Sequence, residues 1–312
     1  MGEHLRFAYV GNAAARYSTE NDVARALRNN GHYVTQIPEQ NLDWTTIPSQ
    51  ADGHDVFLWT RTAGFDPPDL ATQEWALARL DMPTVGYHLD RWWGLNREPD
   101  IFRSPFFTVD LLCTADGSAE WERHGYRHRW FPPAISSLWL QPGTYRKQYA
   151  SEVCFVGNLE DYAHPEWGPY RLELAARLRE RFTLTVVPGK GNRAIRGKAL
   201  ADIYASGKVF VGDSCLPGAP EKYYSDRVPG TCGRGGFLIH PHTPGVRSQF
   251  PELVTYEIGD FGQLCDLVDY YLAHADLRAG IAAENRRHTV SYHTYEHRMT
   301  QLVQTLEDEG LL

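Results

Sequence analysis

A serine, an arginine and a run of glycines between residues 224 and 241 have the chemistry that diphosphate recognition needs. Arginine presents a planar fork of N–H donors to phosphate oxygens, serine adds a short hydroxyl, and glycine lets backbone N–H groups approach an anion closely. The segment therefore predicts a nucleotide or nucleotide-sugar site, although glycines also form plain turns and a surface ion pair would explain the arginine equally well. The predicted diphosphate contacts are Arg227, Ser225, Gly233, Gly235 and Gly236.

Three cations elsewhere in the second half extend this prediction. Lys190 and Arg193 lie in a glycine-containing loop that either closes over phosphates or is simply solvated. Lys208 directly precedes an apolar, strand-like run at residues 209–212. We expect these side chains to help stabilise the negative charge of a leaving diphosphate.

Acid–base and aromatic residues follow an apolar run in the first half of the chain. His88 and Asp90 come just before Trp92 and Trp93. A carboxylate at this position can take a proton from an attacking hydroxyl, and indole faces stack on sugar rings or bases. The alternative is a pair of core tryptophans beside an ion pair between Asp90 and Arg91.

Glu20 is a further carboxylate at the end of a strand-like run. It follows Ser18 and Thr19, which are good helix caps, so a first-turn glutamate favoured by the helix dipole is the structural alternative. The catalytic candidates are therefore Asp90, Glu20 and His88.

Arginines alternate with aromatic residues between positions 123 and 131, which is the most basic aromatic patch of the chain. Such a patch can contact a nucleic-acid backbone or a base, although a strand beside a helix end explains it as well. The candidates for acceptor binding are Trp92, Trp93, Arg127 and Arg129. His128, His240 and His242 lack a third ligand at suitable spacing, and no Asp-x-Asp occurs, so no metal site is predicted.

Length and composition indicate a globular protein of two domains. The chain has 312 residues, of which 42% are apolar and 12% aromatic, with a formal net charge of −8. This charge argues against a surface coated with nucleic acid, while leaving room for a local basic groove. The five cysteines are far apart and include no Cys-x-x-Cys pair, which suits a reducing compartment. With no signal-peptide core or apolar run of about 20 residues, we expect a cytoplasmic protein without a membrane segment.

Short apolar runs alternate with amphipathic stretches twice along the chain. The alternation covers residues 5–131, stops at the two prolines 132 and 133, and restarts at residue 153. This pattern is typical of α/β domains with doubly wound parallel sheets. We predict a first domain over 1–132, a linker over 133–150, a second domain over 151–290 and a C-terminal helix over 291–312 that packs back on the first domain.

The second half also resembles a known family. Its motifs are Ser225-Asp226-Arg227, Gly233-Arg234-Gly235-Gly236, Tyr270-Tyr271-Leu272, His293-Thr294-Tyr295 with Arg298, and Tyr204-Ala205-Ser206 with Lys208. This succession resembles glycosyltransferases with two Rossmann-like domains, the GT-B fold, in the branch related to spore-coat maturation proteins of bacteria and phages. The resemblance covers about residues 150–300 well and residues 1–130 more loosely. One departure is Gly230, where relatives carry a glutamate that binds the donor ribose.

The resemblance implies transfer of a sugar from a nucleotide-diphospho-sugar, with a UDP-sugar favoured, to an acceptor hydroxyl. The donor would bind the C-terminal domain and the acceptor the N-terminal one, across a cleft. Two acceptors fit the residues: a hydroxymethylated pyrimidine in DNA, and a polysaccharide or small metabolite. A nucleotide- or sugar-binding protein without turnover is the alternative of another class, which Gly230 keeps open. An NAD-dependent enzyme is disfavoured because no Gly-x-Gly-x-x-Gly follows the first strand.

Overall fold

The structure is a computed structural model that describes residues 4–14, 16–61, 70–159, 167–188, 195–213 and 222–312. It divides into two compact units. Unit 1 comprises Met1–Pro132 and Tyr295–Leu312, and unit 2 comprises Pro133–Thr294. Residues 133–150, which we predicted as a linker, are therefore part of unit 2. In the part of the chain described above, no helix is both long and apolar enough to span a membrane.

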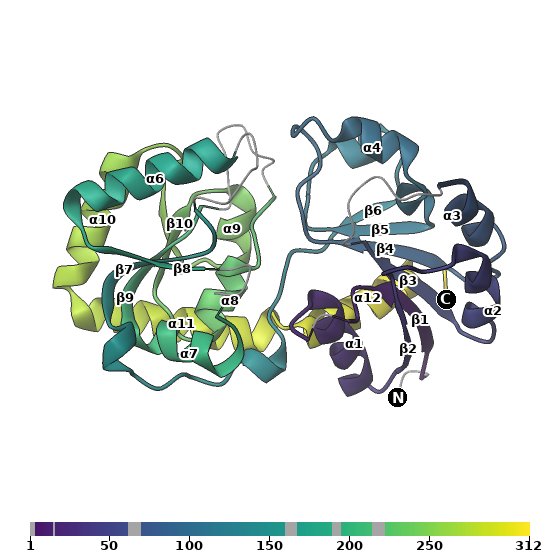
Figure 1. The fold of residues 1–312 in the computed structure, drawn as a ribbon, viewed down its shortest axis with the longest axis horizontal. Coiled ribbons are helices and arrows are strands. Elements are labelled where there is room, and N and C mark those ends of the chain that lie inside the picture. The colour runs from purple at the N-terminus through teal and green to yellow at the C-terminus, as the bar shows by residue number, and fades with distance from the viewer. Residues whose placement is uncertain (1–3, 15, 62–69, 160–166, 189–194, 214–221) are drawn as a thin grey trace. The chain divides into compact units, whose positions relative to one another are not determined.

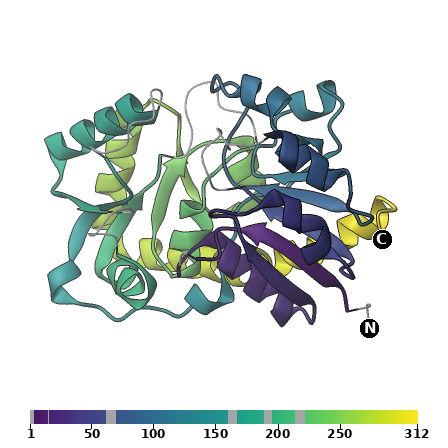
Figure 2. The same cartoon turned by 45° about the vertical axis from the view of Figure 1, so that its right-hand side comes forward.

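Unit 1 is built on a parallel sheet whose strands lie in the order β2-β1-β3-β4-β5-β6. Its strands are β1 (Arg6–Gly11), β2 (Tyr33–Pro38), β3 (Val56–Thr60), β4 (Thr84–His88), β5 (Leu111–Thr114) and β6 (His128–Trp130). Its helices are α1 (Thr19–Asn29), α2 (Ile47–Ala51), α3 (Leu70–Leu77), α4 (Glu98–Arg103), α5 (Glu120–Arg123) and α12 (Tyr295–Asp308), with the 3-10 helices η1 (Trp44–Thr46) and η2 (Pro105–Thr108). Helices flank the sheet on both faces (Figures 1 and 2).

The strand order of unit 1 reverses between β1 and β3. β2 lies on one side of β1, and the chain then crosses to place β3 on the other side. Every residue of β3 and β4 is buried, as expected for strands covered on both faces. In such sheets, ligands bind outside the carboxyl ends of the strands at the point of reversal. For unit 1 this point is the end of β1 and β3, where α1 also begins.

Side-chain hydrogen bonds explain why α1 starts at Thr19 and how its last turn contacts α12. The Ser18 hydroxyl accepts the Asn21 backbone N–H at 3.2 Å, which satisfies one of the free donors of the first turn. At the other end, the Asn30 side-chain amide donates to the Glu296 carbonyl at 2.9 Å and to the Thr300 hydroxyl at 3.1 Å. These bonds join the end of α1 to the first turns of α12 within unit 1.

Unit 2 repeats the architecture with a parallel sheet in the order β11-β10-β9-β7-β8. Its strands are β7 (Ser151–Val156), β8 (Leu184–Val187), β9 (Gly207–Val211), β10 (Leu238–Pro241) and β11 (Val254–Tyr256). Its helices are α6 (Trp167–Arg181), α7 (Gly197–Ser206), α8 (Arg227–Gly233), α9 (Pro244–Gln249), α10 (Phe261–Ala273) and α11 (Ala275–Tyr292), with η3 (Ser137–Trp139) and η4 (Lys147–Tyr149). The order reverses between β7 and β9, so the expected ligand position is at their carboxyl ends.

The glycine run after α8 ends that helix and starts the turn into β10. The Gly236 N–H donates to the Thr231 carbonyl at 3.0 Å, and the Gly235 N–H donates to the Cys232 carbonyl at 2.9 Å. Gly235 has a φ of +82°. Paired bonds of this kind around a left-handed residue form a Schellman cap, which favours glycine because it has no Cβ to clash.

The buried histidines that are held neutral include His128 in unit 1 and His240 in unit 2. Burial first, then the charge of Arg129, lowers the pKa of His128 to about 3. Burial also lowers the pKa of His240 to about 4, although its hydrogen bond with the Pro241 carbonyl opposes the shift. His128 bonds with the Thr114 hydroxyl at 3.0 Å, and that hydroxyl donates to the Asp116 carbonyl, so the His128 Nε2 carries the proton.

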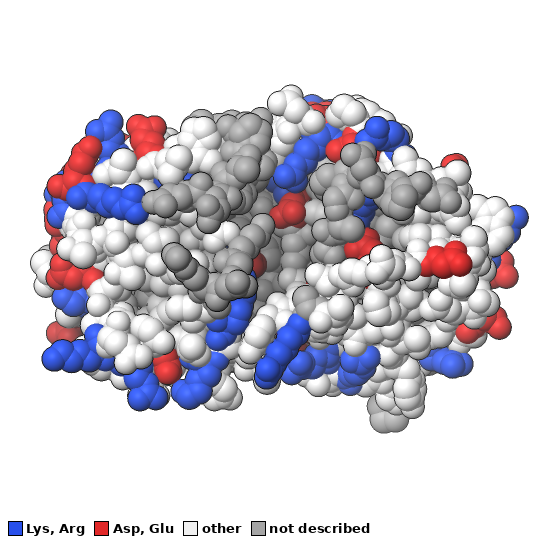
Figure 3. All heavy atoms as spheres, in the orientation of Figure 1, with Lys and Arg blue, Asp and Glu red and all other residues white. Residues whose placement is uncertain are grey.

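Charged side chains of both signs are interspersed on the face of the molecule in Figure 3. Mixed surfaces of this kind are ordinary for a globular protein and carry no functional signal by themselves.

Replacing Gly235 with alanine is expected to lower the free energy of unfolding by about 1–2 kcal/mol, because an L-residue is disfavoured in the left-handed region. Gly280→Ala is the matched control. Gly280 lies on exposed α11, with open space around an added Cβ, so alanine there should raise the free energy by about 0.5–1 kcal/mol. Urea unfolding followed by circular dichroism measures both. Shifts of the same sign would contradict the cap.

The buried histidines also predict a loss of stability as the pH falls. The unfolded chain binds protons at these residues near pH 6.5, whereas the folded chain does so only near pH 3 to 4. The unfolded state therefore gains protons first, and stability falls between pH 6.5 and 4 by up to about 1.4 kcal/mol per pH unit for each histidine. Urea unfolding at pH 7.5, 6 and 5 tests this. A His128→Asn variant should show a shallower dependence, and a flat profile in the wild type would contradict the prediction.

Candidate functional site

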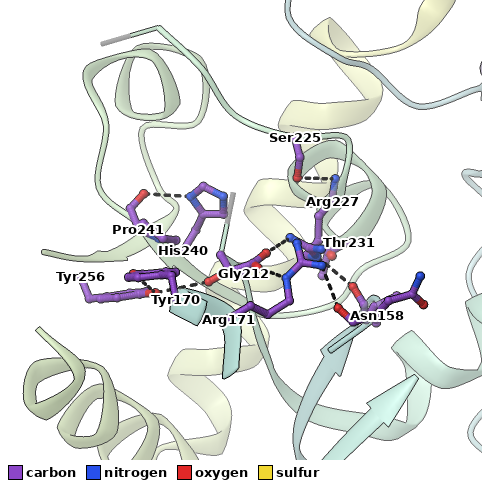
Figure 4. Close-up of polar contacts among 12 residues, drawn as sticks. Asn158, Tyr170, Arg171, Gly212, Ser225, Arg227, Thr231, His240, Pro241 and Tyr256 are labelled. Atoms are coloured by element: carbon purple, nitrogen blue, oxygen red, sulfur yellow. Dashed lines mark hydrogen bonds and ion pairs between the residues drawn. The ribbon is translucent and has the colours of Figure 1, made fainter. Parts of the chain in front are cut away.

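A buried carboxylate pairs with two arginines at the carboxyl edge of the unit 2 sheet; Figure 4 shows the two arginines, Arg171 and Arg227, pointing toward one another. Asp213 follows β9, and its side chain is 0% exposed. Arg227 Nη1 approaches Asp213 Oδ1 at 2.5 Å, and Arg171 Nε pairs with the other carboxylate oxygen. One negative and two positive charges therefore occupy the place where the strand order reverses.

Asp213 is ionised in this cluster. Burial raises the pKa of the carboxyl group, but the charges of Arg227 and Arg171 outweigh it and hold the pKa below its usual value. Burial likewise lowers the pKa of Arg227, but Asp213, together with the charges of Asp226 and Tyr204, outweighs it, so the pKa lies above its usual value. A buried charge survives only when it is paired in this way. The cluster thus carries one net positive charge.

Three elements of unit 2 position the two guanidinium groups. Arg227 opens α8, where the Ser225 hydroxyl accepts its backbone N–H at 3.3 Å, and its Nε–H donates to the Val156 carbonyl at 2.9 Å. Arg171 projects from α6 and donates to the Asn158 carbonyl at 2.8 Å. Both guanidinium carbons lie over the Phe155 ring, at 5.0 Å and 5.4 Å from its centroid. The end of β7 therefore serves as a common support.

The backbone before Asp213 is fixed by close contacts. A Cβ on Gly212 would lie 2.6 Å from His240 Cδ2, so a larger residue does not fit without movement. The Tyr256 hydroxyl is 3.4 Å from the Gly212 carbonyl and also 3.4 Å from the Tyr170 hydroxyl. These contacts fix the position of the Gly212 backbone, and with it the start of the Asp213 side chain.

Arg227 combines partial burial with spare hydrogen-bonding capacity. A guanidinium has five N–H donors, and the contacts above use only some of them. The Arg227 side chain is 13% exposed. This guanidinium is held in place before any ligand binds, and its cluster with Asp213 and Arg171 has one net positive charge. Such a group is suited to binding a phosphate oxygen.

The predicted glycine loop does not supply backbone donors to this site. Gly233, Gly235 and Gly236 lie at the C-terminal end of α8 and before β10, so they are at the amino edge of the sheet. The N–H groups of Gly235 and Gly236 donate to carbonyls of α8 in the cap described above. The prediction that these glycines bind a diphosphate is therefore wrong for this structure.

Lys208 lies at the same amino edge. Its ammonium group is 3.2 Å from Glu152 Oε1, near the starts of β9 and β7. The structure thus does not bring Lys208 to Arg227, because the two residues belong to opposite edges of the sheet. Lys190 and Arg193 lie outside the described residues.

In unit 1, Glu20 lies at the predicted reversal of strand order. It is in the first turn of α1 and only 2% exposed, and a Cβ on Gly11 would lie 2.8 Å from its Cγ. Burial and then the Glu20 charge raise the pKa of Tyr9, whose hydroxyl bonds with Thr60 Oγ1 at 2.9 Å. Glu20 therefore belongs to a buried polar group at the ends of β1 and β3.

His88 ends β4 and has a fixed tautomer. The Asp90 backbone N–H donates to His88 Nδ1 at 3.0 Å, so the proton of the neutral ring is on Nε2. Burial lowers the pKa of His88 to about 4, although the Asp90 charge opposes the shift. His88 is therefore a neutral hydrogen-bond donor near pH 7, not a base at Nδ1, while the Asp90 carboxylate is on the exposed surface.

Trp92 and Trp93 belong to the core of unit 1, which corrects the prediction that they stack on an acceptor. They are 0% and 5% exposed. The cause is Asp116, whose carboxylate accepts both of their backbone N–H groups, at 2.7 Å and 2.9 Å. This bond turns the loop after β4 inward, so that the indoles pack against Phe107 and Trp121.

The basic aromatic patch is partly neutralised. Arg127 Nε lies 3.6 Å from Glu309 Oε2, and Arg129 pairs with the other oxygen of the same carboxylate. Both arginine side chains are about half exposed, at 46% and 48%. They remain on the surface, with a weaker field than the sequence indicated.

Arg171, Asp213 and Asp116 are organising residues that were not among the predicted site residues, although Asp116 follows a predicted strand and was a weaker candidate for lining the crevice of unit 1. Arg171 and Asp213 are separated by 42 positions, so their pairing has no local signature. The only signal was position, since Asp213 and Asp116 each follow a strand-like run. Among the described residues, no group of three or more His, Cys, Asp or Glu side chains could hold a metal ion.

Solved structures share the whole fold of this chain. A glycosyltransferase from Rickettsia africae is 9% identical, with a TM-score of 0.65 over 98% of this chain and 99% of that one. Anabaena HepE, solved with UDP and glucose, is 11% identical, with a TM-score of 0.64 over 98% and 100%. An α-glucosyltransferase solved with UDP and a 13-mer DNA containing an HMU base is 8% identical, with a TM-score of 0.66 over 97% and 99%. These likenesses establish the GT-B fold, two Rossmann-like α/β units.

The sequence comparisons identify the family. No curated protein matches the chain. The profile of the glycosyl transferase-like family matches residues 146–304, which include Arg171, Asp213 and Arg227. Because this match covers just over half of the 312 residues, the chain belongs to the glycosyl transferase-like family.

Proposed function

We propose that this protein transfers a sugar from a UDP-sugar to an acceptor hydroxyl, with the donor diphosphate against Arg227. The observation that carries the proposal is the buried Arg171–Asp213–Arg227 cluster at the carboxyl edge of unit 2. Family membership supports glycosyl transfer, and the neighbours solved with UDP support that donor base. UDP-glucose is the first donor to test, with a UDP-pentose as the second. The spore-coat branch stays a prediction of the sequence motifs.

Charge development explains what the cluster would do in this reaction. As the glycosidic bond breaks, positive charge grows on the sugar and negative charge on the departing diphosphate. The N–H donors of Arg227 that no described residue uses would bind the developing negative charge, and their orientation is set before the substrate arrives. Arg171 would act through Asp213, by keeping the net charge of the cluster positive. Ser225 would hold the start of α8, which carries Arg227.

For the acceptor, the resemblance to glycosyltransferases favours residues of unit 1. Asp90 is the exposed carboxylate that could remove the proton of an attacking hydroxyl if the reaction inverts the anomeric centre. His88 would donate from Nε2 to an acceptor or donor oxygen, and Glu20 would position neighbouring groups rather than exchange protons. If the reaction retains configuration, Asp90 would orient the acceptor and no base would be needed.

A hydroxymethylated pyrimidine in DNA is the acceptor we propose to test first. The support is the α-glucosyltransferase solved with DNA, whose fold this chain shares with TM-scores of 0.66 and 0.68 in two structures. The burial of Trp92 and Trp93 excludes them as stacking surfaces in this conformation. Exposed Arg127 and Arg129 remain the phosphate-contact candidates, reduced by Glu309.

Arg227→Ala should remove the rise in melting temperature that UDP causes and lower kcat/KM for the donor by about 10²–10³-fold. Arg227→Lys tests the same point with the charge retained, and should recover only part of the loss because ammonium lacks the planar fork. Arg181→Ala is the matched control: this arginine also pairs with aspartates in unit 2, but on the exposed surface. Equal stabilisation by UDP in all four proteins would refute the assignment of the donor site.

Acceptor identity is tested by release of UDP from UDP-glucose with different acceptors. An oligonucleotide containing a hydroxymethylated pyrimidine should release UDP and gain the mass of one hexose, whereas the same oligonucleotide with thymine should do neither. Arg127→Gln with Arg129→Gln should raise KM for the oligonucleotide. The dependence of this KM on salt concentration should become shallower, because two phosphate contacts are lost. Turnover only with a polysaccharide or metabolite would redirect the acceptor. UDP binding without turnover on any acceptor would indicate a binding protein instead.

A further inference from the structure

A basic surface pocket lies at the amino edge of the unit 1 sheet, outside the residues used above. It has a volume of about 400 Å³. The lining residues are Arg6, Arg28, His32, Tyr33, Val34, Thr35 and His54. They come from the starts of β1 and β2, the end of α1 and the turn before β3. Glu20 and Gly11, by contrast, lie at the opposite ends of α1 and β1.

The lining contains two arginines and no carboxylate. Arg28 is held as a fork, since its two terminal nitrogens donate to Gln36 Oε1 at 3.1 Å and one of them also donates to the Val34 carbonyl at 2.9 Å. Arg6 makes no side-chain hydrogen bond or ion pair within the described part of the chain. Its backbone N–H donates to Asp55 Oδ2 at 2.7 Å, which places that carboxylate next to the strand. In a protein of net charge −8, such a local excess of positive charge is informative.

The histidines present fixed hydrogen-bonding roles to the pocket. The Leu5 N–H donates to His32 Nδ1 at 3.2 Å, so the neutral ring carries its proton on Nε2 and can donate. His54 Nδ1 lies 3.1 Å from the Ala51 carbonyl and therefore donates to it, while its Nε2 accepts from the Thr35 hydroxyl at 2.8 Å. Both nitrogens of the His54 ring therefore already have hydrogen-bond partners in the protein. Of the two histidines, His32 is therefore the one that can donate to a ligand.

We propose that this pocket binds the phosphate group of a small phosphorylated molecule. The two guanidinium groups and the His32 Nε2–H of the lining favour a ligand that offers acceptors, and the two positive charges favour a dianion such as a phosphate monoester. The volume lies at the lower end of the range for small-molecule sites, which fits a metabolite better than a polymer.

The His32 ring provides a local probe that the donor site in unit 2 cannot disturb. Burial first, then the charge of His4, lowers the pKa of His32. The other charged or titratable groups of the lining are Arg6 on β1, Arg28 on α1 and His54, and the Asp55 carboxylate accepts the Arg6 backbone N–H beside them. A dianion bound beside the ring would favour its protonated form and raise its pKa. Proton NMR of the His32 ring, assigned with a His32→Gln variant, follows this change.

The experiment titrates the full-length protein with glucose 6-phosphate, with inorganic phosphate and, as the uncharged match, with glucose. Both phosphates should shift the His32 signal saturably and raise its apparent pKa, whereas glucose should not. Arg6→Gln with Arg28→Gln should weaken phosphate binding at least 10-fold. Arg25→Gln is the control, because Arg25 lies on the same helix outside the lining. Arg6→Gln alone removes no side-chain bond to any described residue, so it keeps the test valid if the double variant fails to fold.

Three outcomes would overturn the proposal. The first is a His32 signal that phosphate leaves unchanged, and the second is an equal shift in the arginine variants and the wild type. The third is a shift caused by a single-stranded oligonucleotide but not by glucose 6-phosphate, which would indicate a polymer backbone as the ligand. None of these results depends on UDP binding or sugar transfer, so the proposed function would stand or fall separately.

Discussion

The pairing of one buried carboxylate with two guanidinium groups determines the carboxyl edge of unit 2. Asp213 has no exposed surface, so its charge is tolerated only because Arg171 and Arg227 lie against it. Removing one partner from such a group commonly costs about 3–5 kcal/mol, since the remaining charge stays buried. The cluster links α6, β9 and α8 at one point, and Phe155 supports both arginines from β7. The same forces that secure the fold therefore also orient the groups that would meet a diphosphate.

The architecture could be read from the sequence because buried parallel strands are apolar along their whole length. β3 and β4 are buried at every residue, and they appear in the sequence as short apolar runs between amphipathic stretches. The linker boundary was less accessible. Residues 133–150 have the polar, proline-containing composition of a connection, yet the Thr144 N–H donates to Asp202 Oδ1 at 2.8 Å and the Arg146 N–H to the Ser206 hydroxyl at 2.8 Å. Long-range bonds of this kind leave no local pattern.

The candidate site was only partly accessible, for physical reasons that differ between residues. In the sequence, Arg227 follows the strand-like run that forms β9. Residues after a parallel strand lie at the carboxyl edge of the sheet, so Arg227 could be placed there. The sequence could not distinguish a phosphate loop from a Schellman cap, because both need glycine in a left-handed turn. Gly235 precedes the start of β10, so it lies at the amino edge of the sheet, away from the carboxyl edge where a ligand is expected. Trp92 and Trp93 follow a strand, where exposed ligand-binding residues are common, but Asp116 draws their backbone inward. Pairings such as Arg171 with Asp213 arise from the fold alone.

The discontinuity of unit 1 has a consequence for synthesis of the chain on the ribosome. Unit 1 is completed by Tyr295–Leu312, whereas all of unit 2 lies before Tyr295. Domains usually fold as units in the order of translation. Here the second unit in the chain is the first whose sequence is complete. Unit 1 begins earlier, but it cannot be completed until α12 is made and contacts Asn30. The strands of the unit 1 sheet are therefore all made before unit 2, but the surface of unit 1 that α12 covers is the last to be buried.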